Sequence, residues 1–203
     1  MLKFKIFLVL LVAFVYYAVT YCMLSPGICR YYVDYYILYE RSFSIDEERE
    51  FLSKPIKKKA SYFREYTLRD AREVFQMIGV SPEGVQGLWS DGNTVIMSFA
   101  LQQVYTNIEL DFDVSAYINA KNNQVDVEVY HDDRLLANWH FIYERKQPKT
   151  KIKIAKKYLS ENEPINLMFK INGIASPQKL GYSNEIKKFG LIFNKLKIMP
   201  YGE

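Results

Sequence analysis

Apolar and polar residues alternate over much of the second half of the chain. From Ile108 to Ile118 an apolar residue occupies every second position, and acidic or other polar residues lie between them. Because successive side chains of a strand point to opposite faces, this pattern predicts a strand with one buried and one solvated face. The same period of two recurs at residues 125–129, 152–154 and 165–171.

Pairs of turn-forming residues separate these segments. They are Asp91-Gly92, Asn122-Asn123, Asp132-Asp133 and Asn172-Gly173. With further strands expected over 93–101, 135–143 and 189–198, about seven short strands follow one another without long helices between them. We therefore predict an all-β domain over residues 77–203, folded as an antiparallel β-sandwich or jelly roll.

An uncharged apolar run lies near the N-terminus, from Ile6 to Leu24. As a helix this run would be about 28 Å long, close to the hydrocarbon thickness of a bilayer. A cleaved signal peptide begins similarly, but this run ends in bulky residues rather than at a small-x-small site. We predict an uncleaved transmembrane anchor over residues 6–24, with residues 1–5 as a cytoplasmic tip because Lys3 and Lys5 precede the run.

Residues 25–76 are expected to form a Tyr-rich and basic connector near the membrane. The sequence Ser-Ile-Asp-Glu at 44–47 is typical of a capping box and predicts a short helix that ends before Pro55. Residues 54–72 contain seven Lys and Arg residues against two acids. This segment is either a solvated connector or a contact for anionic lipid headgroups or phosphorylated glycans.

Charge and composition narrow the classes of function. The chain has 27 Lys and Arg residues against 23 Asp and Glu residues, and a net charge of +4 argues against a dedicated nucleic-acid binder. Residues 83–133 carry nine acids and one base, whereas residues 146–157 carry six lysines. The acids form either a solvated strand face or a structural calcium site. Since no ordered Asp-x-Asp loop is present, we predict no cofactor, with calcium as the alternative.

No catalytic motif is present in the sequence. There is no Gly-x-Ser-x-Gly elbow, P-loop or Gly-x-Gly-x-x-Gly, and we expect the two histidines, His131 and His140, to be surface or rim residues rather than catalytic ones. Paired carboxylates leave glycoside hydrolysis open by residue type. Because these carboxylates lie on regular strand faces, we predict a protein that is not an enzyme.

Two motifs flank the predicted strands. Residues 78–92 read Ile-Gly-Val-Ser-Pro-Glu-Gly-Val-Gln-Gly-Leu-Trp-Ser-Asp-Gly, and residues 175–185 read Ala-Ser-Pro-Gln-Lys-Leu-Gly-Tyr-Ser-Asn-Glu, followed by Phe-Gly-Leu at 189–191. Together with residues 125–130 and Trp139, they resemble the accessory β-sandwich domain of bacterial membrane-bound phosphoglycerol transferases and surface-polysaccharide glycosyltransferases. The resemblance covers about residues 77–198.

This sequence departs from that family at several positions. Glu185 and Lys187 or Lys188 stand where the family has aspartate and arginine, and Asp132-Asp133 replaces an Asn-Gly turn. The polytopic membrane region and the catalytic domain of the family have no counterpart here. The apolar run and the resemblance together predict a single-pass protein of the bacterial inner membrane with a periplasmic sandwich. That sandwich would bind or position an envelope glycan as an accessory to a polytopic transferase.

The motifs also indicate candidate contacts for a glycan. They are Glu83, Trp89, Ser90, Asp91 and Ser183, with Trp139 as a further candidate. A tryptophan beside Ser-Asp-Gly combines an apolar ring with hydrogen-bonding groups, although Trp89 could instead plug the end of the sandwich while Asp91 closes a turn. The expected partners are an envelope glycan, a polytopic membrane transferase and inner-membrane lipid, with no nucleic acid. A competing hypothesis is a non-catalytic subunit that docks a membrane protein.

Overall fold

The chain is described here by a computed structural model that covers residues 2–24, 30–81, 87–161 and 163–202. It divides into two compact units, Met1–Tyr39 and Glu40–Glu203.

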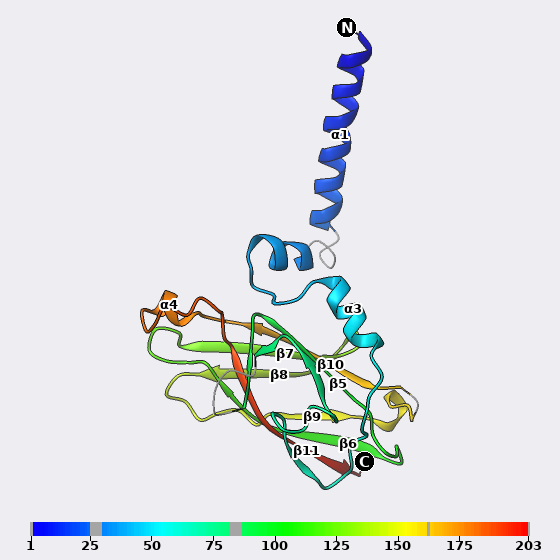
Figure 1. Cartoon of the computed structure of the whole chain (residues 1–203), viewed down its shortest axis with the longest axis vertical. Helices are drawn as coiled ribbons and strands as arrows, with labels where there is room; N and C mark the ends of the chain where they lie inside the picture. The colour runs from blue at the N-terminus through cyan, green and yellow to red at the C-terminus, as the bar shows by residue number, and fades with distance from the viewer. Residues whose placement is uncertain (1, 25–29, 82–86, 162, 203) are drawn as a thin grey trace. The chain divides into compact units, whose positions relative to one another are not determined.

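The first unit is helical (Figure 1). Helix α1 (Leu2–Leu24) is followed by the π-helical turn η1 (Val33–Ile37). The large apolar side chains of α1 that the structure describes, between Ile6 and Tyr21, are exposed. Within the described residues, no helix combines the length and apolar character needed to cross a membrane. The segment predicted as a transmembrane anchor, residues 6–24, is helical.

The second unit is built from two antiparallel sheets. Within the described residues, the first sheet contains β1 (Glu65–Thr67), β3 (Val80–Ser81), β4 (Leu88–Ser90), β6 (Asn107–Ala116), β9 (Lys151–Ile154) and β11 (Leu191–Tyr201). The second sheet contains β2 (Gln76–Ile78), β5 (Thr94–Phe99), β7 (Gln124–His131), β8 (Arg134–Ile142) and β10 (Ile165–Asn172). In Figure 1, β7, β8 and β10 lie above β6, β9 and β11. The predicted antiparallel β-sandwich is confirmed.

The order of the strands shows which strands lie at the edges of the two sheets. The first sheet runs β3-β4-β11-β6-β9, with β1 also pairing β11, and the second runs β2-β5-β10-β7-β8. The connections include the 3-10 turn η2 (Lys156–Tyr158) and the one-turn helix α4 (Pro177–Leu180). Strands β2 and β3 lie at sheet edges, so the two sheets both end near the segment that links these strands.

The core lies between the two sheets. On β6 the inward side chains of Ile108, Leu110 and Phe112 are buried and alternate with more exposed acids, as the period of two predicts. Aromatic rings fill the centre: the Phe112 and Trp139 centroids are 5.8 Å apart, and those of Phe169 and Phe193 are 5.1 Å apart. These large rings supply much of the apolar area that the sandwich buries.

The segment before residue 77 belongs largely to the sandwich. The compact unit begins at Glu40, and Phe75 is part of the same core as the strands. Strands β1 and β2 are hydrogen-bonded members of the two sheets. The predicted boundary between a connector and a domain at residue 77 is therefore corrected to residue 40. Short strands of three residues carry too little periodicity to be recognised in a sequence.

Helix α3 (Ile45–Ser53) has the predicted capping box. The Ser44 Oγ accepts the Glu47 N–H at 3.3 Å, and the Ser44 N–H donates to Glu47 Oε2 at 2.6 Å. Hydrogen bonds to the Glu47 carboxylate, from the Ser44 backbone N–H first and from the Ser44 hydroxyl second, lower the pKa of Glu47. The helix ends before Pro55, and Phe51 packs with Phe43 and Ile96 on the outer face of β5.

The uneven charge along the sequence is balanced across strands. Each acid on the outer face of β6 stands beside lysines of β9 or β11; for example, Lys151 lies 2.6 Å from Glu109 and 3.3 Å from Asp111. Exposed pairs of this kind add little stability but cancel charge. Within the part of the chain that the structure describes, no group of three or more His, Cys, Asp and Glu residues is arranged to hold a metal ion.

Candidate functional site

The two sequence motifs meet at one end of the first sheet. Strand β4 of the first motif pairs with the start of β11, where Trp89 stands opposite Ile192. The Ser90 Oγ accepts the N–H groups of Gly190 and Leu191, both at 2.9 Å. The N–H of Gly92 donates to the carbonyl of Lys188 at 2.9 Å. Segments about 100 residues apart in sequence therefore form one surface.

The Ser-Asp-Gly turn is shaped by its backbone. Gly92 has a φ of +105°, and a Cβ at this position would overlap the carbonyl oxygen of Glu40. The N–H of Asp91 donates to the carbonyl of Gly79 at 2.8 Å. The backbone hydrogen bonds of the turn thus hold the end of β4, which carries Trp89, against two neighbouring segments.

Trp89 lies on the outer face of the first sheet. Its neighbours Leu88 and Ser90 are 2% and 0% exposed and point into the sandwich, so the indole points outward and is half-buried. The ring centroid of Trp89 is 5.2 Å from that of Phe189 and 5.8 Å from that of Tyr117. The Tyr117 and Phe189 centroids are 6.1 Å apart, and all three pairs meet edge to face.

Tyr182, from the second motif, extends this group of rings. Burial and, to a smaller extent, the charge of Tyr182 raise the pKa of Tyr117. The Tyr182 ring is 56% exposed, and the Nζ of Lys121 lies 5.0 Å from its centroid. We call Trp89, Tyr117, Tyr182 and Phe189 the aromatic strip.

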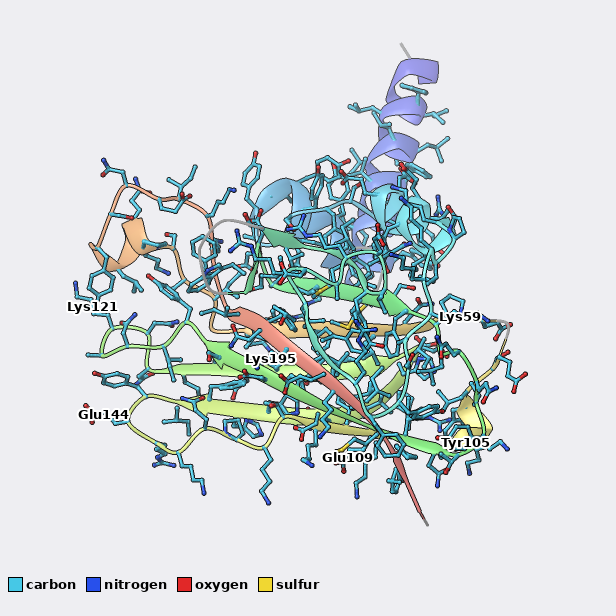
Figure 2. The ribbon with its side chains drawn as sticks, turned by 60° about the horizontal axis from the view of Figure 1, so that its bottom comes forward. Lys59, Tyr105, Glu109, Lys121, Glu144 and Lys195 are labelled. Atoms are coloured by element: carbon cyan, nitrogen blue, oxygen red, sulfur yellow. The ribbon has the colours of Figure 1, made fainter. Side chains whose placement is uncertain are left out.

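Polar groups border the aromatic strip at the Tyr182 end. The Tyr182 hydroxyl lies 3.4 Å from Asn119 Oδ1, and Lys121 Nζ donates to the carbonyl of Leu180 at 2.6 Å. Lys121 lies at one end of the sandwich, far from Lys59 and Tyr105 at the other end (Figure 2). The strip therefore combines aromatic rings with amide, hydroxyl and ammonium groups on one outer surface.

The structure separates the six candidate contacts into three groups. Trp89, Asp91 and Ser183 lie at least partly at the surface, and the Ser183 Oγ accepts the N–H of Glu185 at 3.2 Å. Ser90 and Trp139 are 0% and 2% exposed. Glu83 lies outside the described residues.

The predictions for Ser90 and Trp139 are corrected. Ser90 serves as an internal acceptor for two backbone N–H groups, so its hydroxyl faces the protein rather than a ligand. Trp139 packs against Phe112 and Phe169 in the core. Its chain neighbours on β8 point to the outer face of the sheet. Alternation along a strand shows which side chains share a face. Only the pairing of the strands shows which of the two faces points into the core.

Sequence reasoning missed three members of the aromatic strip. Tyr117 occupies an outward-facing position of the alternating segment that ends at Ile118. An aromatic residue on the solvated face could have indicated a binding surface. Tyr182 and Phe189 belong to the second motif and to the segment that follows it. Their proximity to Trp89 depends on the pairing of β4 with β11, which the sequence does not reveal.

The two histidines have different environments. His140 is exposed and lies 2.8 Å from Asp126, as a surface position predicts. His131 is 8% exposed and is thus more buried than His140. Its Nδ1 lies 3.0 Å from the carbonyl of Asn166 and its Nε2 lies 3.2 Å from that of Tyr158. Both ring nitrogens thus face backbone carbonyls, so His131 holds the η2 segment against β10.

Comparison with known proteins identifies no family. No protein-family model matches the sequence, and no curated protein matches it. Among solved structures, the chain is similar to part of a family 115 4-O-methyl-alpha-glucuronidase with specificity for decorated arabinogalactans, with a TM-score of 0.42 and 12% identity over 74% of this chain. The match spans 19% of that enzyme.

A second similar structure is a family 35 carbohydrate-binding module from Clostridium thermocellum. Here the TM-score is 0.32 and the identity is 9%, over 66% of this chain and 95% of the module. At these identities the likeness concerns the fold alone.

Proposed function

We propose that the β-sandwich is a non-enzymatic carbohydrate-binding domain that takes up a glycan on the aromatic strip. The observation that carries this proposal is the contact of Trp89, Tyr117 and Phe189 on the outer face of the first sheet. A pyranose presents C–H groups on its faces and hydroxyls at its edge. Ring faces pack against the C–H groups, and nearby polar groups bind the hydroxyls.

The surroundings of the aromatic strip supply both kinds of contact. Asp91 lies directly after Ser90 on the first motif, and Asn119 and Lys121 lie beside Tyr182 on the far side. The edge-to-face packing and the bonds from Gly190 and Leu191 to Ser90 hold the rings in place before a ligand arrives. Because little side-chain freedom remains to be lost, binding costs less conformational entropy.

The proposal extends to the place and partner of the domain. We propose that the glycan is a component of the bacterial envelope and that the sandwich is periplasmic and assists a polytopic glycosyl- or phosphoglycerol transferase. The motif resemblance over residues 77–198 supports this part of the proposal. The exposed apolar side chains of α1 support attachment to inner-membrane lipid.

Calorimetric titration of the full chain in lipid nanodiscs tests the proposal. Periplasmic and lipopolysaccharide-derived glycans would be titrated into the native protein, the Trp89→Ala variant and the Tyr143→Ala variant. Tyr143 is an exposed tyrosine outside the strip, with 39% of its surface accessible, and it serves as a matched control. We expect saturable heat from the native protein. Trp89→Ala is expected to weaken the glycan affinity by at least about tenfold, or about 1.4 kcal/mol, whereas Tyr143→Ala leaves the affinity unchanged.

The contrary result distinguishes the competing docking subunit. A folded protein that gives no saturable heat with any of these glycans would contradict the proposal. Copurification with a membrane protein that survives Trp89→Ala would then favour a docking role instead.

A further inference from the structure

A cavity of about 560 Å³ opens where the two sheets end at the same edge of the sandwich. Strand β2 is the last strand of the second sheet, and β3 is the last strand of the first. Met77 of β2, Val80 of β3 and Leu88 of β4 contribute to the wall, together with Phe51 from α3. The volume is within the range of about 300–1,000 Å³ that is usual for small-molecule sites.

The inner wall of the cavity is apolar. Phe75 and Leu88, which are 1% and 2% exposed, are members of the main core, and Phe51 is 7% exposed. Met77 and Val80 are partly buried against the same core. An apolar group that entered this cavity would therefore continue the hydrophobic core and would leave water on insertion.

The rim of the cavity is cationic. Of the described lining residues, Lys54, Lys57 and Arg72 are basic and Glu73 is acidic. Glu73 is already paired with Lys58, and the pKa of its carboxyl is lowered by Lys58 and, to a smaller extent, by Lys57. Lys54 pairs with the exposed Glu50 at 3.0 Å. The rim thus keeps an excess of positive charge directly above an apolar floor.

We propose that this cavity binds a single-chain lipid anion, with its apolar chain against Phe51, Met77 and Leu88 and its phosphate against Lys57 and Arg72. The pattern of one apolar interior and one cationic rim matches a ligand with the same two parts. An arginine beside a lysine suits a phosphate, because the guanidinium offers two parallel N–H donors and the ammonium adds a point charge.

This site is separate from the aromatic strip. Leu88 of the cavity wall is next to Trp89 on β4, but Leu88 points inward and Trp89 points outward, and none of the described lining residues belongs to the aromatic strip. Binding at the cavity is therefore expected to be independent of Trp89, and the two proposals can fail separately.

The test uses the full chain and three probes below their aggregation concentrations. Decyl phosphate carries both parts of the proposed ligand, inorganic phosphate carries only the charge, and decanol carries only the chain. We expect decyl phosphate to bind saturably and each of the other probes to bind at least about tenfold more weakly, since each loses one set of contacts.

Variants place the bound probe in the cavity. Lys57→Gln with Arg72→Gln is expected to weaken decyl phosphate binding by about tenfold or more. Lys59→Gln removes a neighbouring exposed lysine that does not line the cavity and is the matched control. Met77→Trp fills the cavity and is expected to abolish binding, while circular dichroism and thermal melting report whether this variant folds.

Several outcomes would overturn the proposal. Equal affinity for inorganic phosphate would show a plain anion site, and equal weakening by Lys59→Gln would show diffuse attraction to the basic segment. Decyl phosphate binding that is unchanged in both the charge variant and a folded Met77→Trp variant would place the probe elsewhere on the chain. Loss of binding on Trp89→Ala would assign it to the aromatic strip.

Discussion

At the scale of single residues, polar side chains of the two motifs divide into those that face the protein and those that face solvent. Ser90 accepts two backbone N–H groups from the segment that follows the second motif and is 0% exposed, whereas Ser183 is exposed. Both are serines in motif segments, yet only Ser90 has a structural acceptor role. The identity of a residue in a motif therefore does not tell whether it binds a ligand or holds the fold.

Ser90→Ala is expected to destabilise the protein by about 1–3 kcal/mol. The substitution leaves the buried N–H groups of Gly190 and Leu191 without their acceptor, and an unsatisfied buried donor carries its full desolvation cost. Urea unfolding measures the change, with Ser183→Ala as the exposed control expected within about 0.5 kcal/mol of the native protein. Equal stabilities of the two variants would contradict the structural role of Ser90.

Gly92→Ala is expected to be more damaging than Gly202→Ala. At Gly92 the φ of +105° and the Glu40 carbonyl both oppose a side chain, whereas nothing lies within 4 Å of a Cβ at Gly202. The strain at Gly92 is expected to cost about 1–3 kcal/mol, measured as a lower free energy of unfolding. A Gly92→Ala variant as stable as the Gly202→Ala variant would show that the turn adapts without cost.

At the scale of elements, the capping box and the charge pattern of β6 show how local sequence becomes structure. Ser44 and Glu47 satisfy each other's backbone N–H groups and begin α3. On β6 the outward acids are balanced by lysines on the strands beside it, which no local pattern on β6 reveals. Local signals thus predict where an element begins, and pairing decides what its side chains meet.

The contribution of Glu47 to stability is expected to depend on pH. The folded-state pKa of Glu47 is lowered by its bonds with Ser44, so the charged form is favoured in the folded protein. This stabilisation is present above the ordinary glutamate pKa of about 4.3 and is lost as the pH falls through the lower folded-state value. In urea unfolding followed between pH 6 and pH 3, Glu47→Gln removes the titrating carboxyl and should reduce the acid-dependent loss of stability; an unchanged pH profile would contradict this role.

At the scale of the whole molecule, the alternation of residues 108–118 and the spacing of turns were enough to predict two-layered antiparallel β structure. The strands β1 to β4 have two or three residues each, which is too short for a periodic signal, and so the domain start was misplaced. Of the candidate contacts expected from the sequence, Trp89 and Asp91 lie at least partly at the surface. The other rings of the aromatic strip were missed because Phe189 and Tyr117 reach Trp89 only through the pairing of β11 with both β4 and β6.

The most direct test of the central claim uses the fluorescence of Trp89. The chain contains two tryptophans, so Trp139→Phe leaves Trp89 alone as a reporter on the aromatic strip. Urea unfolding first verifies that this variant is folded. Titration with periplasmic and lipopolysaccharide-derived glycans is then expected to shift the Trp89 emission to shorter wavelength and to saturate at the concentration where calorimetric heat saturates, because a sugar ring displaces water from the indole. Saturable heat without any change in Trp89 emission would contradict glycan binding on the aromatic strip.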